Sequence, residues 1–233
     1  PGNINDLNLP ETHHKLKKPL ARNVKPVTLV LVEGRPRLIS PFESEMDGVV
    51  MAYLPGNRGG DAIANVLFGD VNPSGKLPFS YPKYPNALEI YDHKNTQQIG
   101  QSEQTAYNPQ YPFGHGLSYT RFEYSDLNMN DTTITTGGKI QVEVTVTNAG
   151  ERKGKETVMM FLRDHYASVT PSVKRLKGFE KITLDPGQSQ QVPFEIHPED
   201  LMFVGPNNQW IHEEGEFSVI ISNQRASFNF HKS

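Results

Sequence analysis

The sequence predicts an α/β part followed by an all-β part, and three observations carry this prediction. A continuous apolar run at 27–33 is typical of a strand in a parallel sheet. From residue 117 onward, apolar and polar residues alternate with the period of half-buried strands. The 233 residues include 19 Gly and 18 Pro, which mark many turns and exclude a helical bundle. We expect an α/β part at 1–80, an ordered connector at 81–116 and a β-sandwich at 117–233.

The α/β part begins with the run Val-Thr-Leu-Val-Leu-Val-Glu at 27–33, which predicts a strand buried on both faces. A second apolar run at 48–54 follows a stretch, 42–47, that can form one or two helical turns. These segments fit one β-α-β unit with a short crossover. Helical spacing of apolar residues predicts a helix at 59–68, with Asp61 as N-cap and Gly69 as the C-terminal stop.

Residues 81–116 alternate prolines with aromatic side chains and show no sustained apolar period. Flexible Gly/Ser linkers lack aromatics, because such linkers have nothing to pack against. We therefore interpret this segment as a strap lying across a domain surface.

The all-β part shows alternation most clearly at 139–147, and further strands are expected at 157–162, 177–184, 190–196, 216–222 and 226–230. About seven strands with turn signals near every tenth residue predict a sandwich of immunoglobulin or fibronectin III type, without a disulfide. We expect Trp210 and Phe203 in its core.

Charge and composition exclude several function classes. The net charge of −3 provides no basic field for nucleic acid, and the absence of cysteine removes disulfides, thiolate zinc sites and cysteine nucleophiles. The longest apolar stretch, 27–32, is far shorter than a membrane span. No motif indicates a metal or a cofactor, and neither nucleic acid nor a membrane is expected as a partner.

Three motifs have both a structural and a functional interpretation. The glycine-rich segment 56–60 matches no phosphate-binding pattern, so a tight turn is favoured over an anion site. His13 and His14 are adjacent and cannot chelate one metal from a helix, which favours surface histidines. His115 lies between two glycines, where a tight corner is favoured over a catalytic role, since no G-x-S-x-G supplies a nucleophile.

Eight segments form one ordered series, at 32–36, 52–56, 59–70, 72–78, 111–120, 176–180, 184–187 and 215–217. In this order and spacing they resemble the C-terminal half of glycoside hydrolase family 3, the β-glucosidases and their relatives. The resemblance covers essentially the whole chain. It implies the end of an α/β sandwich domain, a connector, and a fibronectin III-like domain.

The resemblance also implies how the chemistry is divided. Family members are retaining enzymes with an Asp nucleophile on an N-terminal (β/α)₈ barrel and a Glu acid/base on the α/β sandwich. In the branch that residues 2–10 resemble, this Glu lies about two residues before the position of Pro1. We therefore expect no catalytic residue in this chain, and we assign neither role to Glu11 or Glu33. A retaining glycosidase needs both carboxylates, so the chain is expected to be inactive by itself.

The expected contribution of the chain is one wall of a pocket for a β-glucoside or oligosaccharide. Asn3 and Asn5 carry amide donors and acceptors that suit sugar hydroxyls, and we predict them as substrate-binding residues, with a polar loop or helix cap as the other interpretation. The expected partner is the N-terminal barrel portion, and a homo-oligomer is possible. The resemblance favours a periplasmic or secreted location.

A non-catalytic β-sandwich module that binds carbohydrate or protein is the alternative. A row of exposed aromatics on one strand face would distinguish it, and Tyr166 and Trp210 are its few candidates.

Overall fold

A computed structural model describes residues 6–9, 25–85, 90–94 and 107–232. The chain forms two compact units, which we treat separately. The α/β unit comprises 1–71, 77–91 and 100–115, and the sandwich unit comprises 72–76, 92–99 and 116–233. An α/β class followed by an all-β class is confirmed, whereas the exact domain limits at 80 and 116 stay predictions.

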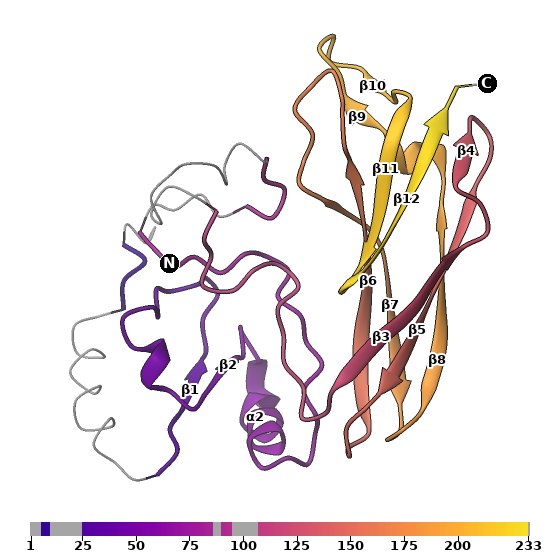
Figure 1. Cartoon of the computed structure of the whole chain (residues 1–233). Coiled ribbons are helices and arrows are strands. Elements are labelled where there is room, and N and C mark those ends of the chain that lie inside the picture. The colour runs from indigo at the N-terminus through magenta and orange to yellow at the C-terminus, as the bar shows by residue number, and fades with distance from the viewer. Residues whose placement is uncertain (1–5, 10–24, 86–89, 95–106, 233) are drawn as a thin grey trace. The chain divides into compact units, whose positions relative to one another are not determined.

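The α/β unit contains the predicted β-α-β arrangement. Strands β1 (Thr28–Leu31) and β2 (Gly48–Met51) pair in parallel, with Thr28 opposite Gly48, and the crossover between them carries the single 3₁₀ turn η1 (Glu43–Glu45). The turn η2 (Gly56–Arg58) then leads into helix α2 (Gly59–Leu67). Figure 1 shows these elements in indigo and purple.

The predicted helix is present, but its N-cap is Arg58 and not Asp61. Asp61 lies in the first turn, where its carboxylate is 3.3 Å from the Arg58 guanidinium. An acidic side chain in the first turn favours the helix through the helix dipole without capping it. Gly69 ends the helix as predicted, with a φ of 83°, and its N–H donates to the Val66 carbonyl.

The glycine-rich segment before α2 serves the turn. Gly56 has a φ of 69°, in the left-handed region that favours glycine. A Cβ at Gly59 would lie 2.6 Å from the Pro55 ring, so this position needs a residue without a side chain. Both glycines have a structural explanation.

The core of the α/β unit is small. Its buried residues are Leu31, Ile39, Phe42 and Tyr81. The prediction that 27–33 is buried on both faces is wrong: within β1 only Leu31 is buried, and Val32 is exposed. Within the described residues of this unit, two strands and the nine-residue helix α2 offer too little surface to cover both faces of the sheet. Leu54 and Phe68 are likewise exposed.

The sandwich unit has two sheets. The three-stranded sheet has the order β3-β5-β8, and the five-stranded sheet has the order β4-β12-β11-β6-β7. Their strands are β3 (Phe122–Met129), β4 (Thr133–Thr135), β5 (Ile140–Asn148), β6 (Gly154–Asp164), β7 (Arg175–Leu184), β8 (Ser189–Ile196), β11 (Gly215–Ile221) and β12 (Gln224–His231). Figure 1 shows the two sheets lying face to face.

Alternation decides which side chains fill this sandwich. In β5, Ile140, Val142, Val144 and Val146 are all fully buried, while Gln141 and Glu143 on the opposite face are exposed. Core residues also recur at every second position in β6, β8, β11 and β12, although Phe161 and Ser218 on the opposite faces are buried too. The strands expected from alternation are confirmed, and the structure adds β3, β4 and a short hairpin.

That hairpin corrects the prediction for the only tryptophan. Strands β9 (Phe203–Val204) and β10 (Trp210–Ile211) pair with each other, apart from both main sheets, after the turn η4 (Pro198–Leu201). Trp210 is 65% exposed and Phe203 is half-buried, so neither belongs to the buried core. A hairpin outside the sheets turns one of its faces to solvent, whatever the hydrophobicity of its residues.

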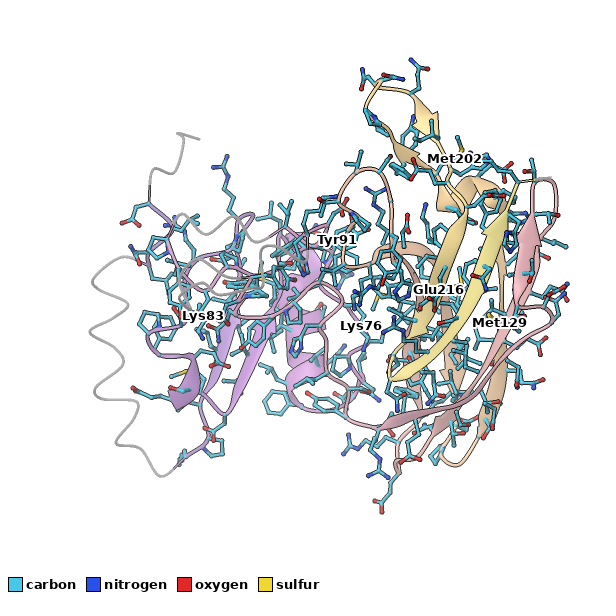
Figure 2. The ribbon with its side chains drawn as sticks, turned by 45° about the horizontal axis from the view of Figure 1, so that its top comes forward. Lys76, Lys83, Tyr91, Met129, Met202 and Glu216 are labelled. Carbon is cyan, nitrogen blue, oxygen red and sulfur yellow. The ribbon has the colours of Figure 1, made fainter. Side chains whose placement is uncertain are left out.

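Residues 72–76 belong to the sandwich unit. The Asn72 side chain donates to the Lys153 carbonyl at 3.1 Å and accepts from the Ser118 hydroxyl and the Tyr119 N–H. Lys76, labelled in Figure 2, pairs with Glu156 at 3.3 Å. This segment is therefore clamped at both ends.

Among the described residues, no helix is both long and apolar enough to cross a bilayer.

Candidate functional site: the anchored segment 6–9 of the α/β unit

The predicted sugar contacts Asn3 and Asn5 lie outside the described residues, and so do His13 and His14. Their roles stay predictions. Residues 6–9 follow them directly in the chain, and the structure shows in detail how this segment is held. We therefore build the site from 6–9 and the side chains that fix it.

Residues 6–9 run alongside the segment that contains Leu38. Asn8 forms a parallel bridge with Leu38, and the Leu38 N–H donates to the Leu7 carbonyl at 2.9 Å. The Asp6 carboxylate accepts from the backbone N–H of Asn8 at 2.8 Å and from its side-chain amide at 2.7 Å. Leu9 packs against the apolar core of the unit. The segment thus has a defined path.

Arg37 fixes this segment through its guanidinium group. One terminal nitrogen donates to the carbonyls of Asp6, at 3.2 Å, and of Asn8, at 3.0 Å. The backbone N–H of Arg37 donates to the Glu33 carboxylate at 3.1 Å, which closes the turn between them. The terminal nitrogen carries two N–H groups in the fixed plane of the guanidinium, so it can donate to both carbonyls at once.

Tyr81 stands behind Arg37 and is only 1% exposed. Its hydroxyl lies 3.2 Å from the Glu33 carboxylate and within hydrogen-bond distance of the Arg37 carbonyl. Burial, followed by the neighbouring Glu33 carboxylate, raises the pKa of this phenol well above its usual range. Tyr81 therefore stays protonated and acts as a hydrogen-bond donor.

A second phenol and carboxylate pair lies beside the first. Tyr111 bridges to Tyr81 through its backbone, and its hydroxyl donates to Glu43 at 2.7 Å. Burial and the hydrogen bond to Glu43 raise the pKa of Tyr111. The His115 ring stacks on Tyr111 with ring centroids 4.8 Å apart. The neighbouring Gly114 has a φ of 81°, so the flanking glycine serves a tight corner.

This network can position groups but is not arranged for acid–base chemistry. Glu33 and Glu43 each accept a hydrogen bond from a phenol, so both carboxylates have a structural role. Within the described ranges, no group of three His, Asp or Glu side chains could hold a metal ion. The arrangement is suited to holding residues 6–9 in one conformation.

Sequence reasoning missed Arg37 and the part played by Tyr81. Their partners lie 29 to 48 residues away in the chain, a separation that no periodicity reveals. The one available signal is the charged cluster Glu33-Gly-Arg-Pro-Arg37 directly after an apolar strand.

Comparison with known families gives a decisive match. Residues 2–119 match the glycosyl hydrolase family 3 C-terminal domain, and residues 156–225 match a fibronectin type III-like domain. The chain belongs to glycoside hydrolase family 3. The resemblance seen in the sequence segments is confirmed, and so is the fibronectin III-like assignment of the sandwich.

Curated relatives in family 3 match nearly the whole chain. A lysosomal β-glucosidase of Dictyostelium discoideum is 40% identical over 97% of this chain and 28% of its own length. A periplasmic β-glucosidase of Salmonella typhimurium is 40% identical over 93% of this chain and 30% of its own length. A β-xylosidase of Formosa agariphila is 37% identical. The chain thus spans about 30% of the length of these family 3 relatives.

Solved structures of family 3 enzymes agree with this assignment. A β-glucosidase from Erythrobacter marinus matches with a TM-score of 0.92 and 34% identity, over 99% of this chain and 31% of that one. A Listeria innocua β-glucosidase in complex with glucose matches with a TM-score of 0.88 and 30% identity, over 98% of this chain and 34% of that one.

Proposed function

We propose that this chain is the C-terminal portion of a retaining β-glucosidase that releases terminal β-D-glucosyl residues. The observation that carries the proposal is 40% identity to two β-glucosidases over at least 93% of the chain. Because a β-xylosidase is 37% identical to the chain, glucose is the first sugar to test and xylose the second.

The α/β unit would supply one wall of the sugar pocket. Asn3 and Asn5 would offer amide groups to sugar hydroxyls, and the Arg37 network supports this assignment because it fixes residues 6–9 immediately after them. The nucleophilic Asp and the acid/base Glu would both come from residues outside this sequence. Retaining hydrolysis requires these two carboxylates about 5–5.5 Å apart on opposite sides of the glycosidic bond.

The partner in this proposal is an N-terminal (β/α)₈ barrel portion. Support comes from the relatives, which are about three times longer, and from exposed apolar side chains on the α/β unit. Val32, Leu54 and Phe68 are exposed, and the described two-stranded sheet has no third strand. An uncovered apolar surface of this kind favours association, so the isolated chain should self-associate in sedimentation experiments unless the barrel portion is present.

For its location, we propose a compartment outside the cytosol. The support is that two similar enzymes are described as periplasmic and as lysosomal.

The test is hydrolysis of p-nitrophenyl β-D-glucoside by the 233-residue chain alone and by the chain with the barrel portion, with intact-mass analysis of each sample. We expect no hydrolysis by the chain alone and release of p-nitrophenol when both portions are present. The first sugar detected by NMR should be β-glucose, as retention requires. Hydrolysis by the chain alone, or an inactive assembly in which both portions are folded, would contradict the proposal.

A further inference from the structure

The sandwich unit has a cleft at the end that carries the β9–β10 hairpin, at the top of the sandwich in Figure 1. Its volume is about 160 Å³. Leu162 and Phe217, both members of the buried core, line its floor. The loop between β6 and β7 lines one wall, and the hairpin, with Met202 at its foot (Figure 2), lines the other. The cleft is thus the open end of the sandwich core.

Trp210 lines this cleft from β10 and leaves 65% of its surface exposed. A tryptophan side chain buries a large apolar area when a partner covers it, and its N–H can donate a hydrogen bond at the same time. Its flat indole ring can pack against the C–H face of another ring. This side chain would be one wall of a binding site.

Asp164 places a carboxylate at the same point. It follows Leu162 by two residues on β6, so the strand period puts both side chains on the core-facing side. One carboxylate oxygen accepts from the Tyr166 N–H at 3.1 Å. Burial raises the pKa of Asp164 to about 6. A partly desolvated acceptor therefore faces the cleft.

Lys177 lines the cleft from β7 and is half-buried. Burial lowers the pKa of its ammonium group, while Asp200 acts in the opposite direction through longer-range attraction. The Lys177 ammonium is not among the buried side-chain atoms that lack a partner, so water reaches it. A ligand hydroxyl can replace such a water and accept a hydrogen bond from the ammonium.

The charges of the lining select the class of ligand. Two carboxylates, Asp164 and Asp200, stand among the cations Lys177, Arg175 and Lys94. The carboxylates would repel an anionic ligand, and the cations would repel a cationic ligand. A neutral ring with several hydroxyl groups can donate to a carboxylate and accept from an ammonium at once.

We propose that this cleft binds one pyranose ring of a neutral β-linked gluco-oligosaccharide, with the ring stacked on Trp210 and its hydroxyls bonded to Asp164 and Lys177. The volume is below the about 300–1,000 Å³ of pockets for drug-sized ligands, so one ring enters and the rest of the chain extends outward. The site lies in a unit to which the proposed function assigns no role in hydrolysis. The inference relies on that function only for choosing glucose as the sugar.

The single tryptophan makes the test direct. Because Trp210 is the only tryptophan among the 233 residues, its fluorescence in the intact chain reports on this cleft alone. Titration with cellotetraose should change the emission in a saturable manner, with a Kd of about 1 mM as for a weak single-ring contact. A flat titration up to about 50 mM, well above that Kd, would overturn the proposal.

Two matched lysine variants separate the cleft from the general surface. Lys177→Met should weaken cellotetraose binding at least about tenfold, because a hydrogen bond from a charged donor is lost. Lys155→Met changes an exposed lysine of β6 that does not line the cleft, and it should bind like the wild type. Unchanged emission of each ligand-free variant shows that the hairpin is intact. Equal affinity of the wild type and Lys177→Met would overturn the assignment.

An anion control distinguishes ligand classes. Inorganic phosphate should not compete with cellotetraose, and tighter binding of phosphate would show an anion site and overturn the proposal. Binding is read without any hydrolysis, so failure of the proposed function leaves this result unaffected. Conversely, Lys177→Met in an active assembly should hydrolyse p-nitrophenyl β-D-glucoside at the wild-type rate.

Discussion

Replacing Glu156 by Gln should destabilise the sandwich unit strongly. The Lys76 ammonium lies 3.3 Å from the Glu156 carboxylate, and the two side chains are only 18% and 10% exposed. Tyr124 also donates to Glu156 at 2.9 Å, and Lys76 donates to the Gly116 carbonyl at 3.0 Å. The substitution removes the negative charge, keeps an acceptor for the phenol, and leaves the ammonium buried without its counter-ion.

The magnitude follows from this geometry. At 3.3 Å and an effective dielectric constant of about 20, the attraction is about 5 kcal/mol before desolvation is counted. Breaking a buried pair by removing one partner costs about 3–5 kcal/mol. Since Gln keeps the bond from Tyr124, we expect the free energy of unfolding to fall by about 3 kcal/mol. The midpoint of thermal unfolding should fall by about 10 °C for a unit of this size.

Urea unfolding followed by Trp210 fluorescence measures this change, because Trp210 belongs to the sandwich unit. The matched control is Glu123→Gln, whose carboxylate lies 3.1 Å from Arg121 with side chains 60% and 72% exposed. It should change stability by less than about 1 kcal/mol. Adding Lys76→Met to Glu156→Gln should restore part of the loss, because the unpaired charge is gone. A loss for Glu156→Gln no larger than for the control would refute the reasoning.

Three further predictions concern other sites. Gly116→Ala should lower the free energy of unfolding by about 3 kcal/mol or more, because its Cβ would lie 2.1 Å from the Gly75 carbonyl oxygen. Gly60 lies in α2 with open space around it, so Gly60→Ala should raise the free energy of unfolding by about 0.5–1 kcal/mol. Urea unfolding measures both changes. Burial raises the pKa of Asp164 from its ordinary value of 3.8 to about 6, so its contribution to stability is present below about pH 4 and is lost as the pH rises through about 6. Asp164→Asn should remove this part of the pH dependence of unfolding. Equal pH profiles for the variant and the wild type would contradict this prediction. Arg37→Leu should reduce kcat of the assembled enzyme about tenfold or more and should speed amide hydrogen exchange at residues 6–9. Arg37→Lys should recover part of the activity. Wild-type exchange rates at 6–9 in Arg37→Leu would show that Arg37 does not anchor this segment.

The sequence predicted the strands whose apolar and polar residues alternate. The alternation at 139–147 identified Val142, Val144 and Val146 as core residues. All apolar side chains of this strand lie on one face, and only that face can turn toward the core. The run at 27–33 identified β1 but not its exposure, since burial on both faces depends on what covers the sheet. Strand β3 was missed because a bulge between Ser125 and Asn128 interrupts its alternation of apolar and polar residues.

The sites depend on contacts that sequence cannot show. Trp210 was expected in the core on hydrophobicity alone, and the structure places it on a separate hairpin, where it lines a cleft. The bonds of Arg37 to residues 6–9 join segments about thirty residues apart, which only the folded chain brings together. Asp164 had a detectable signal, since it is an acidic residue in phase with the core positions of β6.

Residues 72–76 belong to the sandwich unit, whereas residues 77–91 belong to the α/β unit. The sandwich unit is therefore not one continuous stretch of sequence that could be cut out at a single point. A gene fusion that starts this domain near residue 117 would leave Glu156 without Lys76 and Lys153 without Asn72. Exchange of such domains between enzymes should therefore preserve function only where the short segment 72–76 travels with the sandwich.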